Sequence, residues 1–190
     1  MNTKFATVYN RFLGKITDDM YLELTPEDTI KDLQNLLIDA IPGFEFPRVN
    51  LYDYNISVVK MYENEVVEED FIIGVVWEDT IDLEEIPRVL VDRSSFNVKL
   101  SPEEINILAL LMMQSWVQRQ VTSIENIRMK YSGPDFKMTS QANHLSKLLS
   151  LLDETRRNSF HMQRLYKRRK LSKDGYSSNW SVLRETSAID

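Results

Sequence analysis

The sequence contains no cysteine, only two histidines and five glycines, and it has no long apolar run. The lack of cysteine excludes disulfide bonds, thiol nucleophiles and cysteine-ligated zinc sites, and it is compatible with a reducing compartment. The five glycines and six prolines exclude collagen-like and low-complexity chains. The longest apolar run, Ile107 to Met113, is far shorter than the roughly 18 to 20 residues that cross a bilayer. We therefore expect a soluble protein with no membrane partner.

Motifs for catalysis are also missing from the sequence. His144 and His161 lie 17 positions apart, and no HExxH, GxSxG, Walker A or GxGxxG motif is present. Acidic pairs such as Asp18 with Asp19 are not accompanied by a metal-ligand spacing. We expect no enzymatic activity, no cofactor and no metal site.

Charge is distributed unevenly along the chain. Residues 1–92 hold 7 basic and 20 acidic residues, a net charge of −13, whereas residues 93–190 hold 16 basic and 9 acidic residues, a net charge of +7. Such a chain can fold back so that one half neutralises the other, or it can present opposite charges on two faces and attract further copies head to tail. A merely uneven solvated surface is the third interpretation.

The periodicity of apolar residues predicts a helical bundle with a small β insertion. Helices are expected at residues 3–15, 26–41, 102–129 and 140–170, and the third should begin at a capping box formed by Ser101 and Glu104. Strands are expected at 55–62, 71–77 and 95–100. We predict an α+β, mainly α fold in which residues 1–43 and 101–170 form the bundle, 44–100 form an inserted antiparallel region, and 171–190 form a docking tail.

The fourth predicted helix ends in a cluster of basic residues that contains no acidic residue. Such a cluster binds phosphate groups or acidic protein surfaces. Phe160 and Tyr166 interleave with it; they are expected to pack on the core, with the alternative that they stack on bases. The candidate docking cations are Arg156, Arg157, Arg164, Lys167, Arg168, Arg169, Lys170 and Lys173.

Two further segments are candidates for contacts with partners. The serine-rich tail cannot offset its own ordering entropy, so Tyr176 and Trp180 are expected to anchor it on a neighbouring subunit or partner, or on the body of the same chain. The strand-rich region is interrupted by acidic stretches that are expected to be solvated loops facing a channel or an adjacent subunit. Their candidate residues are Glu68, Glu69, Asp70, Glu84 and Glu85.

The second half of the chain resembles the neck proteins of tailed bacteriophages, the head-tail connector or adaptor class. The resemblance is carried by LSPEEINILALLMMQSWVQRQVTSIENIRMKYSGPDF and SQANHLSKLLSLLDETRRNSFHMQRLYKRRK, with weaker agreement at FATVYNRFL and TPEDTIKDLQNLLIDAIPGF. The resemblance is one of general sequence character and of the order of predicted elements, and it covers about residues 100 to 173. The strand-rich region between about Phe44 and Leu100 departs from the smallest members of the class.

The resemblance implies a structural protein of the virion neck that is assembled in the host cytoplasm. Proteins of this class form a ring, commonly of twelve copies, below the portal of the phage head, and DNA passes through the ring. Their C-terminal segments contact the portal or neighbouring subunits. The implied partners are further copies of the chain, the portal protein, tail or further neck proteins, and DNA in transit. The alternative is a DNA-binding regulatory protein that uses the basic helix at 156–173.

Overall fold

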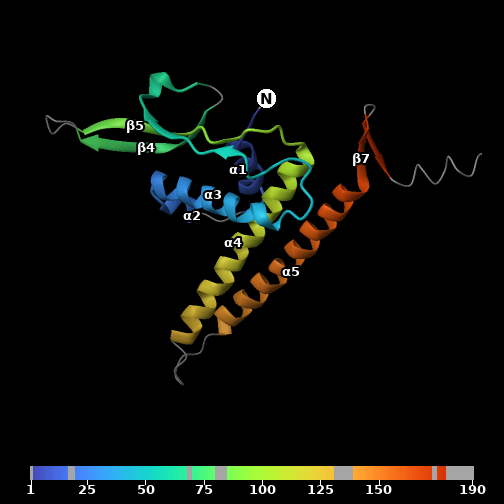
Figure 1. Ribbon diagram of the computed structural model, residues 1–190. Helices are drawn as coiled ribbons and strands as arrows, with labels where there is room; N and C mark the ends of the chain where they lie inside the picture. Colours follow the sequence, from blue (N-terminus) through green and yellow to red (C-terminus); the bar gives the residue numbers. More distant parts are fainter. Residues whose placement is uncertain are drawn as a thin grey trace, which may run out of the picture.

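The computed structural model describes residues 2–16, 20–67, 70–79, 85–130, 139–172 and 175–178. These residues form a mainly α, α+β fold, as predicted, with helices that pack against small antiparallel sheets (Figure 1). The helices are α1 (Phe5–Leu13), α2 (Met20–Glu23), α3 (Pro26–Ala40), α4 (Pro102–Lys130) and α5 (Thr139–Arg168), with 3-10 turns η1 (Ile41–Gly43) and η2 (Glu63–Glu65). The strands are β1 (Thr3–Lys4), β2 (Tyr54–Asn55), β3 (Val58–Met61), β4 (Phe71–Asp79), β5 (Glu85–Asp92), β6 (Ser95–Phe96), β7 (Arg169–Ser172) and β8 (Gly175–Ser178).

Helix α4 begins at the predicted capping box and runs through the centre of the core. The Ser101 amide donates to Glu104 Oε2 at 2.7 Å, and the Glu104 amide donates to Ser101 Oγ at 3.3 Å. The two groups satisfy amide donors that the first turn of a helix leaves unpaired. The next two turns, from Ile107 to Met112, are buried at every position, because α1, α3 and α5 all pack against this helix.

Helix α5 runs back along α4 as a helical hairpin (Figure 1). It continues without interruption through Asn158 and Ser159. It ends at Arg168, two residues earlier than predicted, because Arg169 and Lys170 already belong to β7. The inner face of α5 carries buried leucines in its first half. Its second half carries the buried polar residues Thr155, Ser159 and Gln163.

The longest strands form an antiparallel sheet in the order β3-β5-β4. Strand β5 was not predicted, since its acidic start and Pro87 are typical of a loop. Pro87 is tolerated because β3 pairs only with Val89–Asp92 of β5, so Pro87 lies beyond the end of β3 and faces a strand on one side only. Glu85, predicted in an acidic loop, is therefore the first residue of β5 and pairs with Asp79 of β4.

The second sheet joins the two ends of the strand-rich region to the N-terminal segment. Strand β6 lies between β1 and β2, and Thr3 is opposite Phe96 in the register. It spans only Ser95–Phe96, although a strand over 95–100 was predicted. The Leu100 amide donates to Thr3 Oγ1 at 2.8 Å, which ties the N-terminal strand to the segment just before α4. Phe5 and Tyr54 pack on Phe96 with ring centroids 4.6 and 6.4 Å away, so this sheet shares the core of the helices.

A glycine allows the β3-β5-β4 sheet to approach α3 closely. A Cβ atom on Gly74 would lie 2.8 Å from Pro26 Cγ, and Pro26 is the first residue of α3. We expect Gly74→Ala to displace the start of α3 and to lower the free energy of unfolding by about 1–3 kcal/mol. Urea unfolding measures this, with Val75→Ala at the exposed neighbouring position as the control. Equal stability of Gly74→Ala and wild type would show that Pro26 yields without cost.

Candidate docking surface

The basic residues of α5 form an outward face. Arg156, Arg164 and Arg168 recur every four or eight positions and are exposed, as are Arg157 and Lys167. The prediction that the cations point away from the core is therefore confirmed for these five residues. Residues at this spacing share one side of a helix, so together they form a basic face along the C-terminal half of α5.

The two aromatic rings within this segment have different environments. Tyr166 is 2 % exposed and packs on the core, as predicted. Phe160 is 47 % exposed, so its predicted burial is wrong: it lies four positions from Arg156 and from Arg164 and shares their side of the helix. The Arg164 guanidinium lies 5.0 Å from the centroid of the Phe160 ring. This face therefore combines cations with an exposed aromatic surface.

Several cations of the basic face already contact groups of their own chain. Arg156 donates to the Gln118 side chain of α4 at 2.8 Å, and Arg157 pairs with Asp153 one turn away at 2.8 Å. Lys167 Nζ lies 3.8 Å from the centroid of the Phe46 ring. Exposed contacts of this kind contribute only about 0–1 kcal/mol, so they yield readily to a partner.

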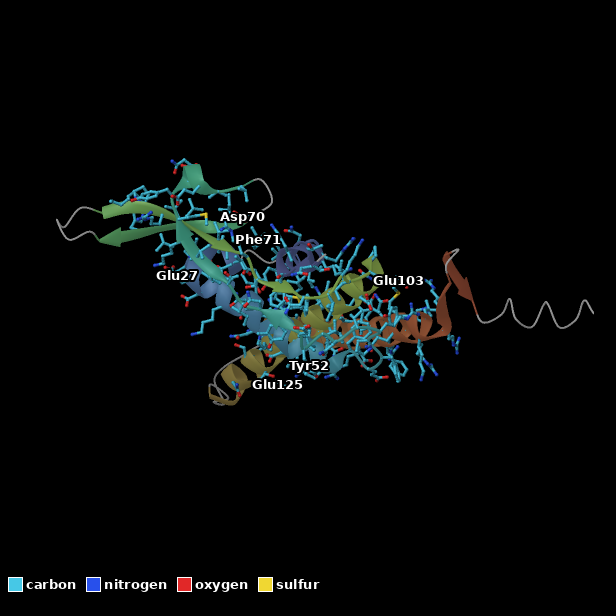
Figure 2. All side chains as sticks on the ribbon, turned by 45° about the horizontal axis from the view of Figure 1, so that its top comes forward. Glu27, Tyr52, Asp70, Phe71, Glu103 and Glu125 are labelled. Atoms are coloured by element: carbon cyan, nitrogen blue, oxygen red, sulfur yellow. The ribbon has the colours of Figure 1, made fainter. Side chains whose placement is uncertain are left out.

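A buried network fixes the C-terminal end of α5 to the start of α4. The Tyr166 hydroxyl donates to Glu104 Oε1 at 2.5 Å, so the capping-box carboxylate also holds the last turn of α5. Burial, together with the Glu104 carboxylate, raises the pKa of Tyr166 above its ordinary value. Arg169 adds an ion pair with Glu103, whose side chain lies beside this end of α5 in Figure 2.

The segment after α3 closes the same network from the other side. Gln163 of α5 accepts from the Glu45 amide at 2.8 Å and donates to the Gly43 carbonyl at 3.2 Å. Arg48 donates to the carbonyls of Tyr166 and Arg169, and its guanidinium lies 4.2 Å from the centroid of the Tyr166 ring. We call this network the α5 latch; its members are Gly43, Glu45, Arg48, Glu104, Gln163 and Tyr166. It fixes the position from which β7 departs.

Beyond the latch, β7 and β8 form a two-stranded antiparallel hairpin. The register pairs Arg169 with Ser178 and Leu171 with Tyr176. Lys170 therefore lies in a strand and not at the end of a helix, and Tyr176, predicted to anchor a tail, lies in β8. Trp180, the other predicted anchor, lies outside the described residues, as does Lys173.

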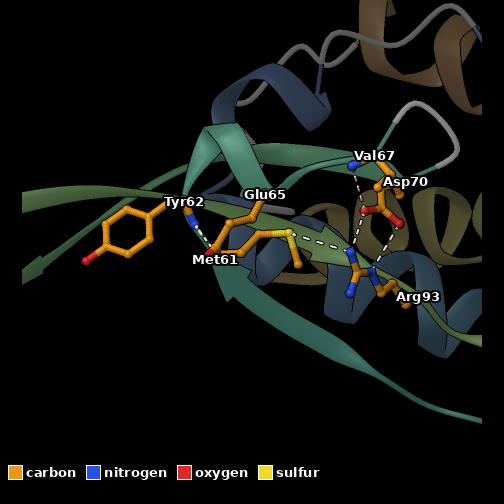
Figure 3. Close-up of polar contacts among 6 residues, drawn as sticks. All are labelled: Met61, Tyr62, Glu65, Val67, Asp70 and Arg93. Atoms are coloured by element: carbon orange, nitrogen blue, oxygen red, sulfur yellow. Dashed lines mark hydrogen bonds and ion pairs between the residues drawn. The ribbon is translucent and has the colours of Figure 1, made fainter.

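Asp70 is bound within its own chain. Its carboxylate pairs with Arg93 at 2.7 Å and accepts from the Val67 amide at 3.2 Å (Figure 3). The hydrogen bond from Arg93 lowers the pKa of Asp70 below its ordinary value. Asp70 was predicted to face a channel or a subunit; here it closes the segment between η2 and β4, and its side chain is only 2 % exposed. Glu68, Glu69 and Glu84 lie outside the described residues, and the Glu85 side chain is not described.

The Asp70–Arg93 pair predicts a dependence of stability on pH. Because the pKa of Asp70 is lower in the folded state, its contribution is present above the ordinary aspartate pKa of about 4 and is lost as the pH falls. We expect Asp70→Asn to be less stable than wild type at pH 7, with a difference that shrinks as the pH falls below about 4. Urea unfolding across this range measures the difference, with Asp53→Asn as an exposed control. A difference that persists unchanged at pH 2 would contradict the prediction.

An exposed apolar strip on β4 was missed by the reasoning from sequence. Ile72, Val75 and Trp77 are 55, 52 and 62 % exposed. They lie opposite Val91, Val89 and Pro87 of β5, and Val89 and Val91 are buried in a small cluster with Met61 and Val66. The segment that contains η2 thus covers the β3 side of this face and leaves the β4 side open. The available signal was the run from Phe71 to Trp77, which carries no polar side chain on either face.

A polar groove of about 460 Å³ lies between α3 and α4. Arg119 of α4 binds Asp32 of α3 through two hydrogen bonds of 2.5 and 3.0 Å, and Tyr21 donates to the same carboxylate at 2.8 Å. The carboxylate is thus occupied by its own chain. Trp116 lines the groove, and its buried Nε1 has no hydrogen-bond partner among the residues that the structure describes. No group of three or more histidine, aspartate or glutamate side chains is placed to hold a metal ion in the part of the chain that the structure describes.

Comparisons with known proteins identify no relative of this chain. Within the described residues, no helix combines the length and the apolar character needed to cross a membrane. No protein-family model, no curated protein and no solved structure matches the chain.

Proposed function

We propose that the protein is a structural component of a bacteriophage virion neck, assembled as a ring that joins the portal to the tail and lets DNA pass. The single observation that carries the proposal is the polarity of the molecule. The β4–β5 hairpin lies at one end, and the basic end of α5 with the β7–β8 hairpin lies at the other (Figure 1). A molecule whose two ends differ in charge and shape forms head-to-tail contacts, and such contacts close into rings when the rotation permits.

The α5 latch supports a role in which the C-terminal end of α5 binds a neighbouring subunit. It holds the last two turns of α5 with one buried and two partly buried hydrogen bonds from two separate segments, so the basic face and the hairpin have a fixed direction relative to the core. A fixed direction lowers the entropy that binding a partner costs. Twelve copies, the portal as partner and the virion neck as location follow from the resemblance of residues 100–173 to the neck proteins.

The mass of the purified protein, alone and mixed with its cognate portal, tests the proposal. We expect a ring of defined copy number in the mixture, measured by light scattering and native mass spectrometry. A chain that stays monomeric and unbound at high concentrations of both proteins would overturn the proposal. Salt-dependent DNA binding by that monomer would instead favour the DNA-binding regulatory alternative, since the basic face is also open to phosphates.

Reversing charges on the basic face is expected to weaken assembly. The variant Arg164→Glu, Lys167→Glu, Arg168→Glu replaces three exposed cations by carboxylates. These carboxylates would repel an acidic partner surface. We expect the concentration needed for half-maximal assembly to rise at least about tenfold. The matched control is Lys31→Glu, Lys99→Glu, Lys147→Glu, which makes the same change in net charge at exposed positions elsewhere. Equal assembly of the two variants would remove the basic face from the interface.

A further inference from the structure

Strand β4 offers a binding edge for another strand. It is nine residues long and lies at the edge of the β3-β5-β4 sheet, so within the described residues it pairs with β5 alone. A long edge strand presents unpaired amide and carbonyl groups that are a template for pairing with a further chain. The exposed strip of Ile72, Val75 and Trp77 on the same strand adds apolar surface that such a chain would cover.

Within the described residues, the β7–β8 hairpin has no third strand. Each of its strands has four residues, and the two form a sheet by themselves. A two-stranded hairpin on its own is marginally stable in water, and three strands with an apolar face are needed for independent stability. Figure 1 shows this hairpin continuing beyond α5, at the end of the molecule opposite β4 and β5. A contact between this hairpin and a β4 edge would therefore join two copies of the chain.

Charge matches the two hairpins to each other. From Glu78 to Glu85, from the end of β4 to the first residue of β5, the sequence has five acidic residues and no basic one. From Lys167 to Lys173, across β7, it has five basic residues and no acidic one. Complementary charges at an interface fix its register and suppress the pairing of two identical ends. An acidic end therefore selects the basic end of a neighbour over a second acidic end.

We propose that the β7–β8 hairpin of one copy adds to the β4 edge of the next, which forms a continuous sheet across the boundary between subunits. The inference rests on the proposed ring and names its subunit contact. The neighbour's strand covers Ile72, Val75 and Trp77, and the paired positions Leu171 and Tyr176 place the hairpin at this edge. In a closed ring every β4 edge is occupied, so this long apolar edge is not left open to promote aggregation.

An engineered disulfide tests the contact directly, and the absence of native cysteine makes it specific. The full chain with Val75→Cys and Tyr176→Cys is mixed with the cognate portal and oxidised with glutathione disulfide. We expect a ladder of covalent oligomers on denaturing gels that disappears on reduction. The control is Tyr52→Cys with Tyr176→Cys, since Tyr52 is 67 % exposed but lies outside this sheet. A Val75–Tyr176 ladder no stronger than the control would overturn the inference.

A charge exchange provides a second test with a gain of function. One variant carries Lys170→Glu and Lys173→Glu, and the other carries Glu84→Lys and Glu85→Lys. We expect each variant alone to need at least about a tenfold higher concentration to assemble. An equimolar mixture should assemble as the wild type does, because each reversed end then meets a complementary one. A mixture that assembles no better than its components would also overturn the inference.

The outcomes separate this inference from the proposed function. A ring on the portal without the Val75–Tyr176 ladder leaves the neck function standing and overturns the β4 contact. A ladder without any portal binding supports the β4 contact and overturns the neck function. If neither a ring nor a ladder forms, both proposals fail.

Discussion

Phe96→Ala is expected to lower the free energy of unfolding by about 3–5 kcal/mol, the usual cost of emptying a buried phenylalanine site. The Phe96 side chain is fully buried on β6, the middle strand of the β1-β6-β2 sheet, and its ring contacts Phe5 and Tyr54. Its removal leaves a cavity where the N-terminal strand, α1 and the strand-rich region meet. Urea unfolding followed by circular dichroism measures the loss.

The control for this cavity is Phe160→Ala. The same atoms are removed from an exposed position on α5, so the expected change is within about 0.5 kcal/mol. Comparable losses at the two positions would contradict the placement of Phe96 in the core. A noncooperative transition in Phe96→Ala, with the helices melting separately from the sheets, would contradict a core shared by both.

Glu104→Ala is expected to lower the free energy of unfolding by about 2–4 kcal/mol. Glu104 is buried and has two hydrogen-bonding tasks, since Oε2 accepts from the Ser101 amide and Oε1 accepts from the Tyr166 hydroxyl. Loss of the first removes a helix cap, which costs about 1 kcal/mol. Loss of the second leaves a buried hydroxyl without an acceptor, which costs about 1–3 kcal/mol.

A double-mutant cycle separates the two tasks of Glu104. Tyr166→Phe removes only the second, so Glu104→Ala and Tyr166→Phe should be non-additive by about 0.5–3 kcal/mol. Glu125→Ala is the matched control, because Glu125 is an exposed glutamate farther along the same helix. Strict additivity of Glu104→Ala and Tyr166→Phe would contradict the hydrogen bond that ties α5 to the start of α4.

The sequence predicts the helices well because their signals are local. Ser101 caps α4 as predicted and Thr25 caps α3, and each accepts from an amide three residues later. The residues that decide these positions lie within one turn of each other, so the pattern and the structure depend on the same contacts.

The strands and the docking surface depend on distant residues, and the sequence predicts them less well. Strand β5 contains a proline and begins with a glutamate, and only the short length of β3 explains why both are tolerated. Asp70 has the pattern of a solvated loop, but its partner, Arg93, lies 23 positions away. The role of Gln163 in the α5 latch was likewise missed, because its partners lie 118 and 120 positions away.

The long separation between Gln163 and its partners has a consequence for synthesis. A nascent chain cannot secure its helical hairpin to Gly43 and Glu45 until Gln163 has left the ribosome. Contacts between such remote positions require large loops to close and therefore slow folding. The basic end thus acquires its final orientation late, after the rest of the core has had time to form.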